Sequence, residues 1–183
     1  MANRHEIRLS GFGGQGIMLA GYIIGQAAAI YGGKHTTHIR DYGPEARGGS
    51  CRADVVISDD HPVLYPYISA PSVLVALSQQ GYDKYRPDSR ENSLIIIDED
   101  LVRHSETRKD RLRTIPALRI AEELGRATVT NVVMLGFLAA VTGIVSIEAL
   151  QKAVKDSVPE AMVALNLKAL ERGYNYAQEK AKA

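Results

Sequence analysis

Short apolar runs alternate with glycine-rich and polar stretches along this chain. An apolar segment around residues 7–9 leads into a cluster of glycines, and residues 17–30 follow as a mostly apolar segment. This order predicts a strand, a glycine turn and a helix. Further continuous apolar runs at residues 73–77 and 94–97 are typical of strands covered on both faces of a sheet.

Weaker patterns predict the elements between and after these runs. Residues 34–41 are short and rich in Thr and His, and residues 53–58 alternate toward an apolar strand, so we predict a strand for each. Charged residues dominate residues 103–113, which favours an exposed surface loop. A short strand near Thr114 and Ile115 is expected to follow.

The last third of the chain is predicted to be helical. Residues 132–142 are apolar in every direction, which indicates a helix buried in a core or an interface, with Asn131 as its N-cap. Ser157 and Glu160 have the spacing of a capping box and predict a final helix over residues 159–180.

Composition indicates an ordinary globular domain. The 183 residues, 45% hydrophobic and 23% charged, are predicted to form a single domain over residues 1–183 with a helical tail at about 150–183. A net charge of +1 favours neither nucleic acid nor a membrane surface as a partner. The chain shows neither a membrane-spanning run nor a signal-peptide core at residues 1–6, and we expect a cytoplasmic location.

The single cysteine limits the chemistry that this chain can perform alone. Cys51 has no partner for an internal disulfide. One thiol also cannot build a cysteine-ligated iron–sulfur cluster or a Cys-rich zinc site. His35 and His38 are spaced i and i+3, and on a strand these positions face opposite sides, so we expect two solvent- or loop-facing histidines rather than a metal pair.

The first candidate site is the glycine cluster after the first strand. Glycines lack the Cβ that keeps a backbone away from a ligand, and unpaired amides at a helix start favour an anion such as phosphate. The spacing also fits the G-x-G-x-x-G pattern of dinucleotide folds, although a tight turn that binds no ligand explains it as well. The predicted cofactor-binding residues here are Gly11, Gly13, Gly14, Gln15 and Gly16.

A second glycine-containing loop follows the second strand. The stretch Tyr-Gly-Pro-Glu-Ala-Arg-Gly-Gly, residues 42–49, can order around an anion through one guanidinium and glycine amides. A solvated connection in which Arg47 pairs with Glu45 is the alternative. The candidate residues are Glu45, Arg47, Gly48 and Gly49. Asn131 is a further candidate, on the hypothesis that it reaches a ligand near the first turn as well as capping its helix.

A nicotinamide site is disfavoured by the second strand. Dinucleotide folds usually place an acidic residue at the end of an apolar second strand, about 20 residues past the glycines, to bind the ribose. Asp41 comes late for this role and follows a polar strand beside Arg40.

Together the two glycine motifs carry a resemblance to a known family. Gly-Phe-Gly-Gly-Gln-Gly at residues 11–16 and Tyr-Gly-Pro-Glu-Ala-Arg-Gly-Gly at residues 42–49 resemble the gamma subunit of 2-oxoacid:ferredoxin oxidoreductases. The likeness continues through residues 50–59 and residues 130–136 and covers most of the chain. The Pro-Glu-Ala-Arg-Gly-Gly form is similar to the 2-oxoglutarate or branched-chain members rather than the pyruvate members.

The resemblance implies a fold and a role within a complex. It implies an α/β fold of three layers, α/β/α, around a Rossmann-like mixed and mostly parallel sheet. It also implies an enzyme that converts a 2-oxoacid, here 2-oxoglutarate, to an acyl-coenzyme A and passes electrons to ferredoxin. The gamma subunit contributes to assembly and coenzyme A binding. Thiamine diphosphate, magnesium and iron–sulfur clusters belong to alpha, beta and, in members that have one, delta subunits.

This role assigns no catalytic residue and no metal ligand to the present chain, which alone is expected to be inactive and to bind no cofactor. No Gly-Asp-Gly motif of the kind that places magnesium and thiamine diphosphate occurs here with its downstream Asn. Two alternatives stay open: a structural subunit whose glycine loops contact only protein, and a stand-alone dinucleotide-binding oxidoreductase.

Overall fold

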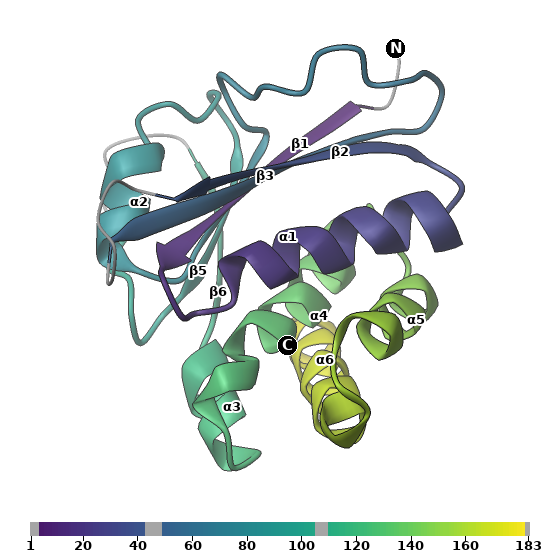
Figure 1. The fold of residues 1–183 in the computed structure, drawn as a ribbon. Helices are drawn as coiled ribbons and strands as arrows, with labels where there is room; N and C mark the ends of the chain where they lie inside the picture. The colour runs from purple at the N-terminus through teal and green to yellow at the C-terminus, as the bar shows by residue number, and fades with distance from the viewer. Residues whose placement is uncertain (1–3, 43–48, 105–109, 182–183) are drawn as a thin grey trace.

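Residues 4–42, 49–104 and 110–181 are described by a computed structural model of the chain. Within them, one mixed sheet has the strand order β2-β3-β1-β4-β5-β6 (Figure 1). Strands β1, β4, β5 and β6 run parallel, whereas β3 is antiparallel to both β1 and β2. The strands are β1 (Arg4–Phe12), β2 (His35–Tyr42), β3 (Ser50–Ser58), β4 (Val73–Ala76), β5 (Leu94–Asp98) and β6 (Arg111–Ile115).

Helices cover the two faces of this sheet unequally (Figure 1). The short helix α2 packs against β1, β3 and β4 on one face. Helix α1 lies across β1, β2 and β3 on the opposite face, where α4 packs beside it and α6 packs on α4. The helices are α1 (Ile17–Gln26), α2 (Gln79–Tyr85), α3 (Ala117–Glu123), α4 (Thr130–Thr142), α5 (Ile147–Ser157) and α6 (Glu160–Lys180). The predicted three-layer α/β fold is confirmed.

Alternating side chains of the central strands supply two cores. Val73, Val75 and Ile96 join α1, α4 and α6 in the larger core, whereas Leu74 and Ile95 pack with the tyrosines of α2 in the smaller one. Because both faces of these strands are buried, their sequences read as continuous apolar runs. This arrangement explains why β4 and β5 could be located from the sequence.

Helices α4 and α6 approach each other at two glycines. A Cβ added at Gly136 would lie 2.0 Å from the carbonyl oxygen of Leu170, and one added at Gly173 would lie 1.9 Å from that of Val133. Neither distance is physically possible for a real side chain, so each helix fits only against a glycine of the other. The C-terminal helix is thereby held close along α4.

Three sequence predictions about local structure are wrong. Residues 111–113 belong to strand β6, not to an exposed loop. Ser157 does not cap the last helix, because its hydroxyl donates to Ala153 O and Gln26 Oε1. His38 does not face solvent: its imidazole packs beneath α1, where a Cβ at Gly21 would lie 2.7 Å from Nε2. In each case a tertiary contact overrides the local pattern.

No helix within the described ranges is long and apolar enough to cross a membrane.

Candidate functional site

The first glycine turn connects the end of β1 directly to α1. Gly14 has a φ of 100° and Gly16, the N-cap of α1, has a φ of 71°. These left-handed conformations are strained for residues that carry a Cβ. The N–H groups of the first helical turn have no acceptor within the helix, and Gly16 offers no side chain to cap them.

Gln15 holds this turn in shape. Its Oε1 accepts a hydrogen bond from the Phe12 N–H at 2.7 Å, and its Nε2 donates to Leu77 O, just past β4, at 2.8 Å. Both ends of the amide are therefore engaged within the chain. The structure gives Gln15 a positioning role, and a direct ligand contact from its side chain stays a prediction.

Asn131 reaches the same turn from the start of α4. Its Nδ2 donates to Gly16 O at 3.0 Å, its side chain is buried, and its Oδ1 is buried with no hydrogen-bond partner among the described residues. The prediction that Asn131 caps its helix is wrong, because α4 begins at Thr130 with Val129 as the N-cap. The packed contact is so close that a Cβ at Gly16 would lie 2.4 Å from Nδ2.

The second glycine loop ends beside the first. The Gly13 N–H donates to Gly49 O at 3.2 Å, and Ser50, the first residue of β3, pairs with Phe12. The first motif and Gly49, the last residue of the second, therefore lie side by side where β1 ends and β3 begins. Among the candidate residues of this loop, Glu45, Arg47 and Gly48 lie outside the described residues.

The first turn is open to solvent. Gly13 and Gly14 are exposed, and Phe12 is 37% exposed. Exposed glycines followed by the unpaired amides of a helix start can donate hydrogen bonds to an anion or to another chain. The turn thus presents main-chain donors at an exposed position.

A cation that sequence reasoning missed lies at the base of the second loop. Lys84 of α2 places its Nζ 3.4 Å from Ser50 Oγ and 5.1 Å from the centre of the Tyr85 ring. Among the described residues no carboxylate lies within ion-pair distance of Lys84, whereas Arg52 nearby pairs with Asp41 at 3.0 Å. Nothing in the local sequence identifies Lys84, because the chain brings α2 to this position only through the crossover between β4 and β5.

Asp41 cannot serve as the ribose-binding acid of a dinucleotide fold. It lies on β2, and β3 separates β2 from β1. Two strand spacings amount to roughly 9.5 Å, and in dinucleotide folds the acidic strand is the immediate neighbour of β1. The strand order therefore agrees with the sequence argument against a nicotinamide site.

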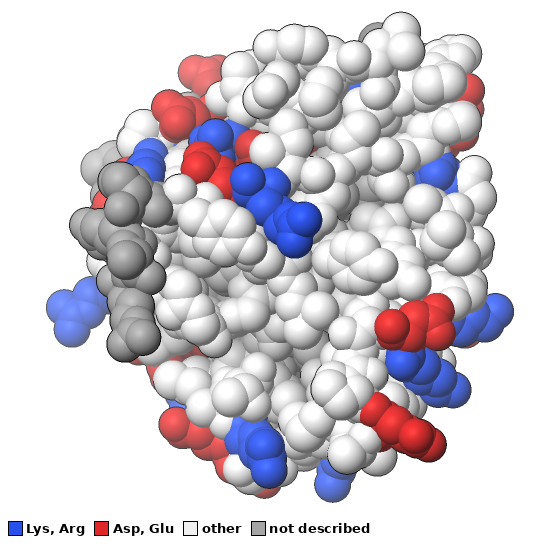
Figure 2. All heavy atoms as spheres, in the orientation of Figure 1, with Lys and Arg blue, Asp and Glu red and all other residues white. Residues whose placement is uncertain are grey.

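An apolar surface adjoins the glycine turn along α1. Tyr22 and Ile30 are 52% and 68% exposed, and Tyr42 at the end of β2 is 66% exposed. Figure 2 shows this face, where the part over α1 is largely uncharged and charged side chains lie mainly over β2 and toward the rim. Exposed apolar side chains along one surface favour contact with another protein.

Cys51 is buried, and burial raises the pKa of its thiol, which makes the thiolate scarce at neutral pH. Within the ranges that the structure covers, no three His, Cys, Asp or Glu side chains gather as metal ligands.

The family can now be assigned from the whole sequence. Residues 6–176 match the family model described as pyruvate ferredoxin/flavodoxin oxidoreductase. The chain belongs to this family.

Individual relatives agree with this assignment. The chain is 49% identical over 179 residues to 2-oxoglutarate synthase subunit KorC of Methanocaldococcus jannaschii, covering 96% of this chain and 95% of the relative. The keto/oxoacid ferredoxin oxidoreductase gamma subunit of Geobacter sulfurreducens is 41% identical with a TM-score of 0.85, covering 96% and 99% of the two chains. The predicted resemblance to a gamma subunit is therefore confirmed.

The same fold also occurs inside a longer chain. The 2-oxoglutarate:ferredoxin oxidoreductase of Magnetococcus marinus matches with a TM-score of 0.87 at 23% identity, covering 96% of this chain and 31% of that one. At this identity the likeness concerns the fold alone.

Proposed function

We propose that this chain is the gamma subunit of a 2-oxoglutarate:ferredoxin oxidoreductase. The reaction is the oxidative decarboxylation of 2-oxoglutarate to an acyl-coenzyme A, with electrons passed to ferredoxin. The 49% identity to a 2-oxoglutarate synthase subunit, over nearly the full length of both chains, supports the subunit type and the substrate. The enzyme is proposed to act in the cytoplasm.

The chain's own residues support a role without redox chemistry. One cysteine cannot ligate a cluster alone, so we assign thiamine diphosphate, magnesium and the iron–sulfur clusters to the alpha, beta and, where present, delta subunits. The isolated gamma chain is then inactive. Its contribution is to position groups that its partners and coenzyme A supply.

The proposed contact point is the first glycine turn, residues 11–16, together with the end of the second loop at Gly49. The hydrogen bond from Gly13 to Gly49 brings the buried end of the second loop against the exposed first turn, and this observation carries the proposal. The amides of Gly14 and of residues 16–19 and the Lys84 ammonium, together with Arg47 as predicted from the sequence, would bind the phosphates of coenzyme A. Coenzyme A supplies the thiol that accepts the acyl group, and holding its phosphates would keep that thiol near the partner's active site.

The substrate assignment is tested by purifying the complex through a tag on this chain. The purified complex should reduce ferredoxin with 2-oxoglutarate and coenzyme A, and far more slowly with pyruvate or 2-oxoisovalerate. Preference for either of the other acids would contradict the 2-oxoglutarate assignment, and loss of all such activity with the partners present would contradict the family role.

The coenzyme A contact is tested in the assembled enzyme with Lys84→Gln and Arg47→Ala. Loss of an exposed charged contact should raise the apparent KM for coenzyme A by about two- to tenfold, with the KM for 2-oxoglutarate unchanged. Lys168→Gln, which removes an exposed lysine from α6, is the matched control.

A purely structural role is the second candidate, and the exposed apolar side chains around α1 favour it. It predicts that the same two variants lower the yield of complex and leave the coenzyme A dependence unchanged. The stand-alone dinucleotide enzyme predicts saturable binding of NAD, NADP or FAD to the isolated chain by calorimetry.

A further inference from the structure

Strand β6 leaves one edge of the sheet unpaired. It is the last strand in the order β2-β3-β1-β4-β5-β6, and within the described residues no strand lies beyond it. Its Arg111 N–H donates to Ser93 O, and its Ile115 O accepts from the Glu99 N–H, so alternate residues bond toward β5. The backbone groups of Leu112 and Thr114 therefore point outward.

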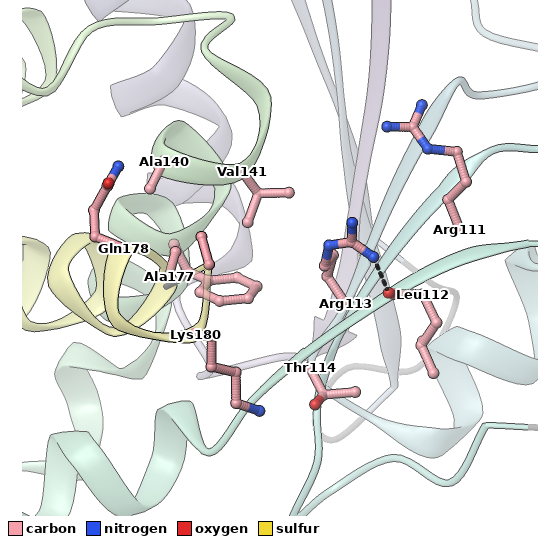
Figure 3. Close-up of a pocket in the computed structure, with 11 residues that line it drawn as sticks. Arg111, Leu112, Arg113, Thr114, Ala140, Val141, Ala177, Gln178 and Lys180 are labelled. Carbon is pink, nitrogen blue, oxygen red and sulfur yellow. Dashed lines mark hydrogen bonds between the residues drawn. The ribbon is translucent and has the colours of Figure 1, made fainter. Parts of the chain in front are cut away.

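A pocket of about 600 Å³ lies beside this edge, on the face of the sheet that carries α4 and α6 (Figure 3). Its apolar part is formed by Phe137, Ala140 and Val141 of α4 together with Ala177 of α6. A side chain from an added strand would enter this space, because side chains on alternate positions of a strand point to the same face.

The rim of the pocket is basic. Arg111 and Arg113 are exposed and, among the described residues, have no carboxylate within 4 Å. The Arg113 guanidinium donates to Leu112 O at 2.9 Å, which is visible in Figure 3. Lys180 adds a third cation, 3.9 Å from Glu99 and 5.0 Å from the centre of the Tyr176 ring. Two guanidinium groups without a carboxylate partner among the described residues favour an anionic occupant.

This edge is separate from the glycine turn. Asn131 contacts that turn at the start of α4, and Val141 lines the pocket ten residues further along the same helix. At 1.5 Å per residue the two positions lie about 15 Å apart along the helix axis. A partner at β6 and a ligand at the glycine turn can therefore be bound at the same time.

We propose that β6 accepts an extended segment of a partner subunit as a seventh strand of the sheet. The segment carries acidic side chains that meet Arg111 and Arg113 and an apolar side chain that fills the pocket. Outward backbone groups supply the affinity and the basic rim selects the acidic partner. The inference rests on the proposed function in one respect, namely that the partner belongs to the same oxidoreductase complex.

Amide hydrogen exchange at single-residue resolution tests this directly. The isolated chain and the purified complex are compared at the N–H groups of Leu112 and Thr114. Pairing with an added strand should slow both at least about tenfold in the complex. Exchange as fast in the complex as in the isolated chain would overturn the proposal.

A matched pair of variants separates the backbone contact from the side chain. Thr114→Pro removes the outward N–H, and Pro is tolerated on an edge strand, whereas Thr114→Val removes only the hydroxyl that donates to Glu99. Thr114→Pro should reduce partner retention by at least about tenfold, with Thr114→Val near the original level. Equal retention of both variants would contradict the added strand.

Charge is tested by the double variant Arg111→Gln with Arg113→Gln, with Arg126→Gln as the control on another surface. The double variant should release the partner at lower salt, and the control should not. A complex that forms and turns over 2-oxoglutarate while its β6 amides stay unprotected would reject this inference and leave the proposed function standing. A chain that joins no oxidoreductase complex would reject the proposed function itself.

Discussion

The side-chain amide of Asn131 donates to the backbone carbonyl of Gly16, 115 positions earlier in the chain, at 3.0 Å. This contact fixes the start of α1 against the start of α4. It holds the glycine turn against α4, so that the N–H groups at the start of α1 stay in a fixed orientation. Preorganised donors of this kind bind a partner with less loss of conformational entropy.

Asn131→Ala should destabilise the chain by about 1–3 kcal/mol, because the Gly16 carbonyl keeps the Ala20 N–H but loses its second donor, and the buried Asn131 side chain leaves a space. Unfolding in urea, followed by circular dichroism, measures the change. Asn175→Ala, at an exposed position of α6, is the control and should change the free energy of unfolding by less than about 0.5 kcal/mol. Equal effects of the two variants would show that the Asn131 contact contributes nothing.

Gly16→Ala and Gly33→Ala form a second matched pair. Both positions have positive φ, 71° and 64°, so both variants carry about 1–2 kcal/mol of backbone strain. Only at Gly16 would the new Cβ also meet Asn131, at 2.4 Å, whereas nothing lies within 4 Å at Gly33. Gly16→Ala should therefore be clearly the more destabilising in urea. Indistinguishable midpoints would contradict the packed contact at the turn.

Gly136→Ala and Gly25→Ala should change stability in opposite directions. At Gly136 the new Cβ would lie 2.0 Å from Leu170 O, which forces α4 and α6 apart and should cost more than about 3 kcal/mol. At Gly25 of α1 the nearest atoms are 3.9 Å away, so alanine should stabilise the helix by up to about 1 kcal/mol. Thermal unfolding of both variants gives the two signs, and a stable Gly136→Ala chain would refute the close helix crossing.

Stability should fall in mild acid because of His38. Burial beneath α1 lowers the pKa of His38 below its ordinary 6.5, so the unfolded chain takes up a proton more readily than the folded one. The stabilisation is complete above pH 6.5 and is lost as the pH falls toward the lower folded pKa. The free energy of unfolding, measured from pH 7 to pH 5, should decline less steeply in His38→Gln. An identical slope would remove His38 from the explanation, leaving His5, whose pKa burial also lowers.

The central strands were predictable because strands buried on both faces have continuous apolar sequences, as at residues 73–77 and 94–97. The first three residues of strand β6 were assigned to a loop because an edge strand beside a basic pocket carries Arg111 and Arg113 at alternate positions, which resembles a charged loop. Charged residues in a sequence indicate exposure, but they do not show whether the backbone of those residues is hydrogen-bonded to a neighbouring strand.

The candidate site shows the same limit. Both glycine loops were identified from their motifs, and the Gly13–Gly49 hydrogen bond brings them together. The partners that hold or complete the site, Leu77 for Gln15 and Lys84 beside Ser50, come from distant elements that only the fold brings close. The role of Asn131 was likewise hidden, because a cap and a tertiary contact have the same sequence signature.

The most direct measurement is amide exchange at Gly14 and residues 16–19 in the isolated chain, in the purified complex, and in the complex with coenzyme A. If the glycine turn donates hydrogen bonds to something outside this chain, exchange there should slow on assembly or on addition of coenzyme A. Exchange that is equally fast in all three samples, while the complex is intact and active, would contradict the account.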